Sequence, residues 1–373
     1  MVKISLCMIV KNEEDTLGRC LESVEGIPDE IVIVDTGSTD KTKEVAKKWT
    51  DKIFDFEWVD DFSKAREYSF ELASKTSDYI MWLDADDVLL PEDRLKALKL
   101  KKELNKDKID AVSMLYQIPS SNEKDTEGFS KDNIRVSLNR LRLVKRDKGF
   151  KWEGIVHEDL VLNIPYTIYN SDIVVTHKKP LKKINPERNI SIYEKHIKKG
   201  VKLSVGDMIN YARELQVLKK YGKAIELYNK ALKVKTLHYK SRVLVLHYLA
   251  TCYYATGKIE KEFKLTLDSF KYDIPHPAFC CRMGEYFIKN NRFEEAIFWY
   301  NLALNLNLEI TNFHDIDFYA YRTWLPLKQL AFCFFKIGNY KKSLEYSKKA
   351  FEYLPNDEEI INNIKFLEKV VED

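Results

Sequence analysis

Two segments near the N-terminus decide the fold: SLCMIVKNEE at residues 5–14 and IVIVDTGSTDKT at residues 31–42. Each begins with a run of apolar residues, rich in β-branched side chains in the second segment, which is typical of a buried strand. Each run ends in polar and turn-forming residues. Between them, apolar side chains recur at the spacing of one helical face, at Leu17, Cys20, Leu21 and Val24. The pattern therefore predicts a strand, a helix and a second strand.

The same alternation continues as far as residue 87. Apolar spacing predicts helices near residues 42–49 and 65–72, and short apolar runs predict strands near residues 53–56 and 79–83. Alternating strands and helices are typical of a mainly parallel sheet that is covered by helices on both faces. Ligands in such sheets lie beyond the carboxyl ends of the strands. The sequence puts Asp35 and the segment Asp84-Ala85-Asp86-Asp87 at those ends.

This candidate ligand site is rich in carboxylates and poor in glycine. No G-x-G-x-x-G follows the first predicted strand and no G-x-x-x-x-G-K-[ST] occurs, which counts against a dinucleotide-binding dehydrogenase and a P-loop NTPase. Carboxylates two residues apart, such as Asp84 and Asp86, can instead meet one hard cation that also binds phosphate. Aspartates in turns are also common as helix caps and solvated loop residues, and that alternative stays open at this point.

Four ordered segments carry a resemblance to a known family. The two segments above, with FSKAREYSFELA at residues 62–73 and YIMWLDADD at residues 79–87, resemble the nucleotide-sugar domain of family 2 glycosyltransferases, which has the GT-A fold. The resemblance implies that Asp86 binds a divalent cation, Mn²⁺ or Mg²⁺, with the donor diphosphate. It assigns nucleotide-sugar binding to Val10, Lys11, Glu13, Asp35, Arg66 and Asp84. Glu67 departs from the family pattern, because many relatives have Asn after the arginine.

Plainer roles exist for three of these residues. Asp35 could be a helix cap, Arg66 could belong to a surface ion pair, and Lys11 could be an ordinary solvated lysine. The structure of the site must separate these alternatives.

A second motif, FKWEGIVHED, occupies residues 150–159. It resembles the later part of the same catalytic domain, where G-x-[IV]-H-E recurs in members that also carry helical repeats. An inverting transfer needs a carboxylate that deprotonates the acceptor, and the resemblance makes Glu158 the candidate base with Asp159 as runner-up. His177 follows a strand-like run, and the resemblance assigns it to the metal, because a histidine after the acceptor-side segment often completes the metal shell in GT-A enzymes. His157 competes for that role, and either histidine could be a plain core or surface residue.

From about residue 185 the pattern changes to continuous helix. Two patterns of residue spacing recur along this half of the chain. The first occurs at Leu249-Ala250/Tyr253/Gly257, Met283-Gly284/Phe287/Asn291 and Leu330-Ala331/Phe334/Gly338, and the second at Ala224/Tyr228/Ala231, Ala296/Tyr300/Ala303 and Ser343/Ser347/Ala350. These patterns resemble tetratricopeptide repeats of roughly 34 residues. Small residues at the repeated positions let paired helices approach closely, and each repeat buries its face against its neighbours. The sequence therefore predicts an α/β GT-A domain at residues 1–184 and an all-α repeat domain at residues 185–373.

Composition limits the partners and the compartment. The chain of 373 residues has 61 Lys and Arg against 58 Asp and Glu, so its net charge of +3 gives no indication of nucleic-acid binding. Apolar runs are too short for a membrane span or a signal peptide, so we expect no transmembrane segment and a cytoplasmic protein. The six cysteines lack Cys-x-x-Cys spacing and lie mostly among apolar residues. This favours buried free thiols over disulfides or zinc ligands.

The resemblance implies an inverting, metal-dependent hexosyltransferase that uses a nucleotide-sugar, and the usual donors of the family favour a UDP-sugar. Repeat-bearing relatives include enzymes that glycosylate peptides, some at cysteine. The favoured acceptor is therefore a peptide or protein, and a cell-envelope glycan is the alternative acceptor. A non-catalytic repeat scaffold with a vestigial transferase domain is another alternative. A nucleotidyltransferase would also fit the metal cluster, but this chain lacks the Gly/Lys-rich activation loop that such enzymes usually have near the first strand. The repeats also offer a candidate homodimer interface.

Overall fold

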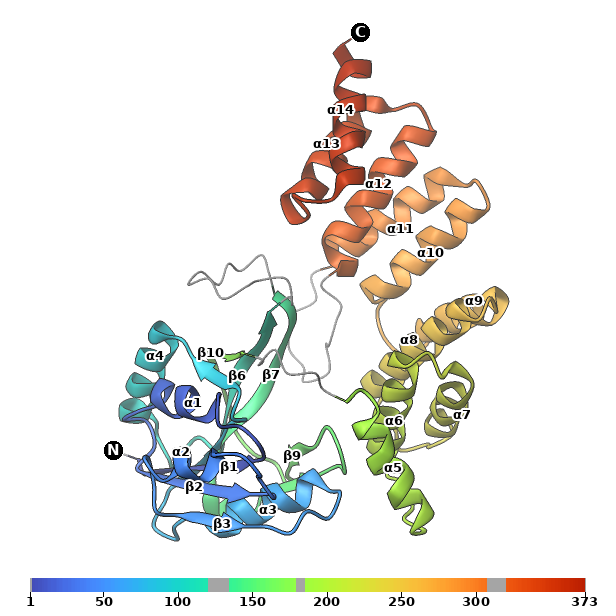
Figure 1. Ribbon diagram of the computed structural model, residues 1–373. Helices are drawn as coiled ribbons and strands as arrows, with labels where there is room; N and C mark the ends of the chain where they lie inside the picture. The colour runs from blue at the N-terminus through green and yellow to red at the C-terminus, as the bar shows by residue number, and fades with distance from the viewer. Residues whose placement is uncertain (1, 120–133, 179–184, 307–319, 373) are drawn as a thin grey trace. The chain divides into compact units, whose positions relative to one another are not determined.

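The computed structural model describes residues 2–119, 134–178, 185–306 and 320–372. The chain forms two compact units, residues 1–210 and 211–373, and each is described by itself. A sheet with helices builds the first unit, and helices build the second (Figure 1). The predicted succession of an α/β domain and a helical repeat domain is thus confirmed. The domain boundary expected at residue 185 stays a prediction.

An eight-stranded mixed sheet forms the centre of the first unit, in the order β3-β2-β1-β4-β7-β6-β10-β5. Its strands are β1 (Ile4–Val10), β2 (Glu30–Asp35), β3 (Ile53–Asp55), β4 (Tyr79–Trp82), β5 (Asp87–Leu89), β6 (Ala111–Pro119), β7 (Ile134–Lys145) and β10 (Ile168–His177). Strands β1 to β4 run parallel, whereas β7 lies antiparallel between β4 and β6. A separate antiparallel pair joins β8 (Lys151–Glu153) to β9 (Asp159–Val161). The predicted parallel order therefore holds for the half of the sheet with the N-terminal strands.

Helices pack on this sheet through residues that alternate along β1. The helices of the first unit are α1 (Leu17–Ser23), α2 (Thr42–Ala46), α3 (Phe62–Glu71), α4 (Pro91–Glu103), α5 (Arg188–Lys198) and the start of α6 (Val205–Val217). One face of β1, with Leu6 and Met8, shares a buried core with Leu21 of α1 and Ala97 of α4. Helix α3 contacts β1 and β2 and lies on the other face of the sheet (Figure 1). This two-sided cover explains why β2 is apolar on both sides.

The parallel strands bring distant polar residues to one edge. Val10 is the register partner of Asp35, and Cys7 of β1 is the partner of Trp82 at the end of β4. Because β1, β2 and β4 point the same way, Asp35 and the turn that follows Trp82 emerge at the same edge of the sheet. The candidate site is built at this edge.

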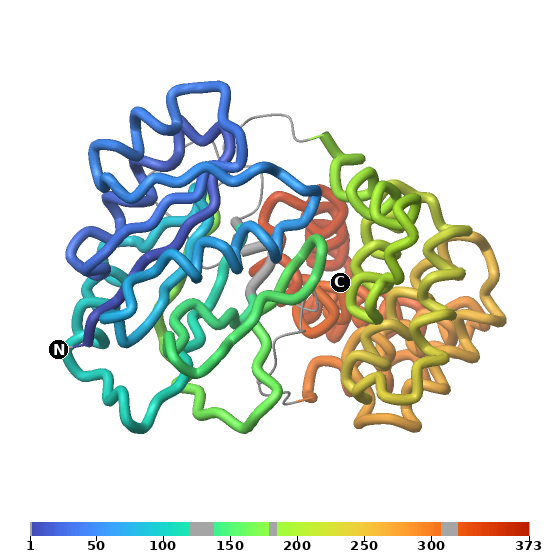
Figure 2. Tube along the Cα trace, turned by 90° about the horizontal axis from the view of Figure 1, so that it is seen from below, coloured from blue at the N-terminus to red at the C-terminus, as the bar shows by residue number. Residues whose placement is uncertain are grey.

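The second unit is a stack of consecutive helices (Figure 2). They are the end of α6, α7 (Tyr221–Leu232), α8 (Tyr239–Ala255), α9 (Ile259–Ser269), α10 (Pro277–Lys289), α11 (Phe293–Asn305), α12 (Trp324–Lys336), α13 (Tyr340–Tyr353) and α14 (Glu358–Glu372). The need for small residues is clearest at Gly284 of α10. A Cβ atom there would lie 2.5 Å from the ring of Tyr300 in α11, so this pair of helices requires glycine at their contact.

Two expectations from composition can be compared with the structure. All six cysteines are buried and free, and burial raises the pKa of the Cys252, Cys280 and Cys333 thiols to about 12. In the described part of the chain, no helix combines the length and the apolar character that a membrane span requires.

Candidate active site

The ends of β1 and β2 meet at Asp35. Thr36 donates its backbone N–H to the Val10 carbonyl oxygen at 2.9 Å, which ties the two strand ends together. Asp35 is 1% exposed, and its Oδ1 accepts the N–H groups of Gly37 at 2.9 Å and Ser38 at 2.8 Å. Its Oδ2 is buried and has no hydrogen-bond partner among the described residues. A buried acceptor left in this way costs about 1–3 kcal/mol, so it suits a ligand hydroxyl or amide that donates to it.

The two loops beside Asp35 are joined by hydrogen bonds. Asn12, in a left-handed conformation with φ 56°, donates its N–H to Ser38 Oγ at 2.9 Å and accepts the Thr39 N–H at 2.8 Å. The Glu13 N–H donates to Thr42 Oγ1 at 2.7 Å. Lys11 is exposed. Of the residues predicted here, Val10 and Asp35 therefore line the edge, Glu13 takes part in its framework and Lys11 projects from it.

Arg66 is the central cation of the site. Its guanidinium donates from Nη2 to Asp84 Oδ1 at 2.6 Å and from Nε to Glu158 Oε1 at 2.5 Å. The side chain is 7% exposed, and its guanidinium lies over the rings of Trp82 at 4.6 Å and Trp152 at 5.0 Å. A surface ion pair does not describe this arrangement. Arg66 instead joins Asp84, which follows β4, to Glu158, which lies 92 residues beyond Arg66 in the chain.

The charge of Arg66 sets the ionisation of Asp84. Burial opposes the charged carboxylate, but Arg66 and Arg142 outweigh burial and hold the pKa of Asp84 well below its usual range. The same two carboxylates, Asp84 and Glu158, raise the pKa of Arg66 against the effect of burial. The Arg66–Asp84 contact is therefore an ion pair throughout the neutral pH range.

A second group of charges involves the last two residues of the Asp84–Asp87 turn. His177 Nδ1, at the end of β10, lies 3.4 Å from Asp86 Oδ1 and 3.3 Å from Asp87 Oδ1. Ligand atoms of these three residues all lie within 4.8 Å of one another, which is close enough to surround one metal ion. The predicted pair of Asp86 and His177 thus lies together. His157 is exposed in the turn before Glu158.

Two residues of this group, Asp87 and Arg142, are given no role of their own from the sequence. Asp87 is fully buried, and its Oδ2 lies 3.0 Å from Nη2 of Arg142, which is also fully buried. The Arg142 guanidinium lies between the rings of Trp82, 3.9 Å away, and Tyr116, 4.8 Å away. The sequence offers only a weak signal, a basic residue between two apolar ones in Leu141-Arg142-Leu143. Once Arg142 is buried, it requires a buried anion.

The turn that carries Glu158 is tight. Gly154 has φ 107°, and a Cβ atom there would lie 3.2 Å from the Cα of Glu158, so this position favours glycine. His157 also adopts a left-handed conformation, with φ 59°. The turn directs Glu158 inward, where it is 7% exposed. Asp159 remains exposed, and its Oδ1 lies 3.5 Å from Arg140. The two candidate bases therefore differ sharply in their surroundings.

Glu67, the departure from the family pattern, has a structural role. It accepts the N–H of Trp152 at 3.2 Å and pairs with Lys151 at 2.5 Å. These contacts join α3 to β8, the strand that leads into the Glu158 turn.

The stability of the metal-free protein is expected to depend on pH through His177. Burial lowers its pKa, but Asp86 and Asp87 outweigh burial and raise the pKa to about 9 from 6.5. Because the folded-state pKa is the higher one, the protonated imidazole stabilises the fold fully below pH 6.5, and this contribution disappears as pH rises through 9. His177→Gln should lower the free energy of unfolding by about 2 kcal/mol in mildly acidic buffer and by little in alkaline buffer.

Urea denaturation in a chelator across this pH range measures the difference. The wild type measured at the same pH values is the reference, and His157→Gln, at an exposed histidine outside the Asp86, Asp87 and His177 group, is the comparison variant. A His177→Gln difference that is the same at every pH would contradict the contact with the two carboxylates.

Comparisons with known proteins agree with both halves of this description. Residues 5–157 match the family model of glycosyl transferase family 2, and residues 277–309 match that of the tetratricopeptide repeat. A TPR repeat-containing protein of Synechococcus elongatus is 45% identical over 92 residues, which are 25% of this chain and 22% of that protein. Glycosyltransferase SunS of Bacillus phage SPbeta is 28% identical over 238 residues, which are 61% of this chain and 53% of that protein.

Further matches have the same character. An uncharacterized glycosyltransferase of Rickettsia typhi is 36% identical over 92 residues, covering 25% of this chain and 30% of that protein. The solved structure of YrrB, described as a TPR protein with an unusual peptide-binding site, has a TM-score of 0.36 and 16% identity, and covers 48% of this chain and 84% of that one. The chain spans from about a fifth to about half of the length of these curated relatives. It carries an N-terminal family 2 glycosyltransferase domain and C-terminal tetratricopeptide repeats.

Proposed function

We propose that the protein is an inverting, metal-dependent glycosyltransferase that moves a hexose from a nucleotide-sugar, with UDP as the favoured nucleotide, to a peptide or protein side chain. The observation that carries this proposal is the buried Arg66 bridge, which joins Asp84 on the donor side to Glu158. The unpartnered Asp35 Oδ2 supports it, because a nucleoside supplies the hydroxyl and amide donors that this oxygen lacks among the described residues.

A divalent cation fits the chemistry of Asp86, Asp87 and His177. Two carboxylates with one imidazole suit Mn²⁺ better than Mg²⁺, since Mg²⁺ keeps mostly oxygen ligands. A bound cation would neutralise the diphosphate leaving group. The fixed carboxylates of the Asp84–Asp87 turn would hold the donor in place, so the sugar carbon is presented in one orientation.

Transfer by one displacement requires one base. The acceptor heteroatom attacks the anomeric carbon, its proton passes to a carboxylate, and the bond from that carbon to the nucleoside diphosphate breaks. Glu158 is our candidate for this base, because Arg66 connects it to Asp84. Asp159 is the second candidate, because it is exposed to an incoming acceptor.

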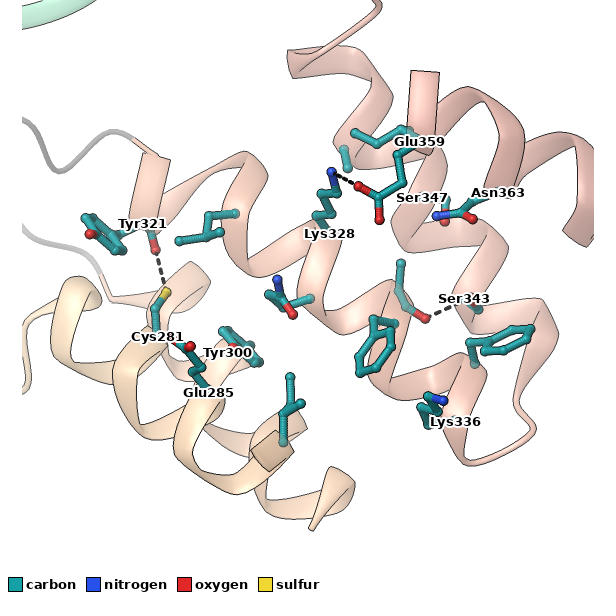
Figure 3. A pocket seen from close by; sticks show the side chains of 18 of the residues that line it. Cys281, Glu285, Tyr300, Tyr321, Lys328, Lys336, Ser343, Ser347, Glu359 and Asn363 are labelled. Atoms are coloured by element: carbon teal, nitrogen blue, oxygen red, sulfur yellow. Dashed lines mark hydrogen bonds and ion pairs between the residues drawn. The ribbon is translucent and has the colours of Figure 1, made fainter. Parts of the chain in front are cut away.

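The repeat unit contains a cavity that suits an acceptor peptide. It has a volume of about 830 Å³ and is lined by residues of α8 and of α10 to α14. Figure 3 shows lining side chains from α10 to α14. Phe332, Phe335 and Phe366 line it and are 38–54% exposed, together with the amide side chains of Gln329 and Asn363. Aromatic rings and amides suit the side chains and backbone of a peptide. We propose this cavity as the place where the acceptor is recognised.

Nucleotide release separates the proposed enzyme from the alternatives. The full chain is incubated with UDP-sugars, Mn²⁺ or Mg²⁺, and either peptides or envelope glycans, and UDP release and acceptor mass are followed. Release with a hexose-sized mass gain on a peptide supports the proposal, whereas a mass gain on the glycan alone favours an envelope transferase. Failure to bind any nucleotide-sugar would indicate a repeat scaffold with a vestigial domain.

Replacement of Asp35 tests the nucleotide site directly. Asp35→Asn keeps an oxygen for the N–H groups of Gly37 and Ser38 but replaces the other oxygen by an amide. We expect UDP affinity to fall about tenfold or more, since the lost acceptor is buried and a net hydrogen bond to a charged group contributes about 1.5–3 kcal/mol. Isothermal titration calorimetry measures the dissociation constant.

The matched control for this test lies one strand away. Asp55 is the register partner of Asp35 on β3, and its side chain is 77% exposed. Asp55→Asn should leave UDP affinity unchanged. Equal weakening by both substitutions would place the nucleotide elsewhere.

A further inference from the structure

The turn that carries Glu158 is held from outside the strands it connects. The backbone of Ile155 makes two hydrogen bonds to distant segments. Its N–H donates to Asp207 Oδ1 of α6 at 2.9 Å, and its carbonyl oxygen accepts the N–H of Phe62, the first residue of α3, at 3.0 Å. Both polar groups of this residue are thus fixed by other elements.

The next residue is held by α5. The hydroxyl of Tyr193 donates to the Val156 carbonyl oxygen at 3.0 Å, and the Tyr193 side chain is completely buried. Asp207 is fixed in the same sense. Its second oxygen accepts the hydroxyl of Ser204 at 2.6 Å, and its N–H donates to Ser204 Oγ at 3.0 Å, which is a reciprocal cap at the start of α6. The side chains of Tyr193 and Asp207 are therefore held in place by their own surroundings as well as by their contacts with the turn.

Helix α5 also holds the loop that precedes α3. His196 Nε2 lies 2.8 Å from the carbonyl oxygen of Asp60, and Lys195 Nζ lies 3.0 Å from Asp60 Oδ1. Since α3 begins two residues later and carries Arg66 one turn further on, α5 fixes both sides of the Arg66–Glu158 contact. The holding residues on α5 and α6 all follow residue 157, where the match to the glycosyltransferase family ends.

We infer that α5 and the first turn of α6 are part of the catalytic unit, and that Tyr193 and Asp207 are positioning residues that hold Ile155 and Val156 so that Glu158 meets Arg66. The inference rests on the proposed function in one respect, the role of Glu158 in transfer. It gives these helices a task in the active site that is separate from the repeat surface.

The geometry of the turn explains why it needs such support. Gly154 and His157 both have positive φ, at 107° and 59°. A non-glycine residue in this region costs on the order of 1 kcal/mol and persists only when its surroundings impose it. The strands β8 and β9 are three residues long each, so their own pairing is a weak clamp. Tyr193 and Asp207 supply the missing restraint.

Three substitutions test the inference in the full chain. Tyr193→Phe removes one hydroxyl and leaves the ring that fills the core. Asp207→Ala removes the acceptor of the Ile155 N–H, and Asp207→Asn keeps an acceptor oxygen and serves as the conservative rescue. Tyr228→Phe is the matched control, because Tyr228 is also fully buried and its hydroxyl donates to Gln216 at 2.9 Å in the repeat unit.

Hydrogen exchange of residues 150–160 and transfer kinetics are measured on each variant. We expect exchange of this segment to rise about tenfold in Tyr193→Phe and Asp207→Ala, and to stay near wild type in Asp207→Asn and Tyr228→Phe, because opening by about 1.4 kcal/mol is a tenfold change. The kcat should fall about tenfold with the same two variants while the UDP dissociation constant stays within about twofold, since displacement of a reacting group affects the chemical step.

Two results would overturn the inference. One is unchanged exchange of residues 150–160 in Tyr193→Phe. The other is a loss of UDP affinity as large as the loss of kcat, which would indicate general loosening of the domain. Failure of the proposed function looks different: the wild-type chain then releases no UDP from any donor, while exchange of the segment still responds to Tyr193 and Asp207.

Discussion

Asp86→Asn is expected to lower kcat/KM for UDP release by about a hundredfold or more and to weaken Mn²⁺ binding in parallel. Asp86 lies at the tip of the turn after β4, and its Oδ1 is 3.4 Å from His177 Nδ1. The substitution removes one of the two negative charges that face the imidazole. Without that charge the site neutralises less of the cation, and the diphosphate loses its counter-ion.

The measurements are Mn²⁺ titration by calorimetry and turnover with and without a chelator. Excess chelator should abolish turnover of the wild type, and added Mn²⁺ should restore it. Asp172→Asn is the matched control, because Asp172 lies on β10 like His177 but its side chain is 81% exposed and pairs with Lys96. Wild-type Mn²⁺ affinity and turnover in Asp86→Asn would remove the metal from the proposal.

Loss of the Arg66 guanidinium should harm both stability and activity. Arg66→Ala leaves Asp84 and the buried Glu158 without their shared cation. Removing one partner of a buried ion pair costs about 3–5 kcal/mol, and the partial exposure of Asp84 puts this case near the lower end. Arg66→Lys should also be impaired, because one ammonium cannot reproduce the fork that reaches two carboxylates. Chemical denaturation and UDP release give the two readouts.

Two further variants make this test sharper. Arg94→Lys is the control, since Arg94 is partly exposed and donates to the Glu25 carbonyl oxygen at the surface, and it should stay close to wild type in both readouts. The double variant Arg66→Ala/Glu158→Gln removes a buried charge together with its partner. It should regain part of the lost stability without regaining turnover. If turnover returns as well, Glu158 is not the base.

Local patterns in the sequence were sufficient to predict the edge of the sheet at which β1, β2 and β4 end. Strand periodicity in β1, β2 and β4 depends on neighbouring residues, and parallel order then brings Val10, Asp35 and Asp84 to one edge without further information. The resemblance to a known family added Arg66 and Asp86. The roles of these residues remain predictions, although the structure brings them into one site.

Pairings between distant segments could not be predicted in the same way. Asp87 meets Arg142 only because β7 runs antiparallel beside β4, a register that depends on the whole sheet. Glu158 reaches Arg66 through a turn that α5 and α6 hold by hydrogen bonds to Ile155 and Val156. Such contacts join side chains that are far apart in the sequence, and they cannot be predicted from the periodicity of neighbouring residues.

The burial of the six cysteines has a practical consequence for work on this protein. Burial raises the pKa of each thiol, so the thiolate form that reacts with oxidants and electrophiles is scarce at neutral pH. Purification and assay can therefore omit dithiothreitol, which binds Mn²⁺ and would compete for the metal. None of these six cysteine sulfurs is exposed to a sugar donor in the folded chain. Glycosylation of a cysteine peptide can therefore be measured without a signal from modification of the enzyme's own cysteines.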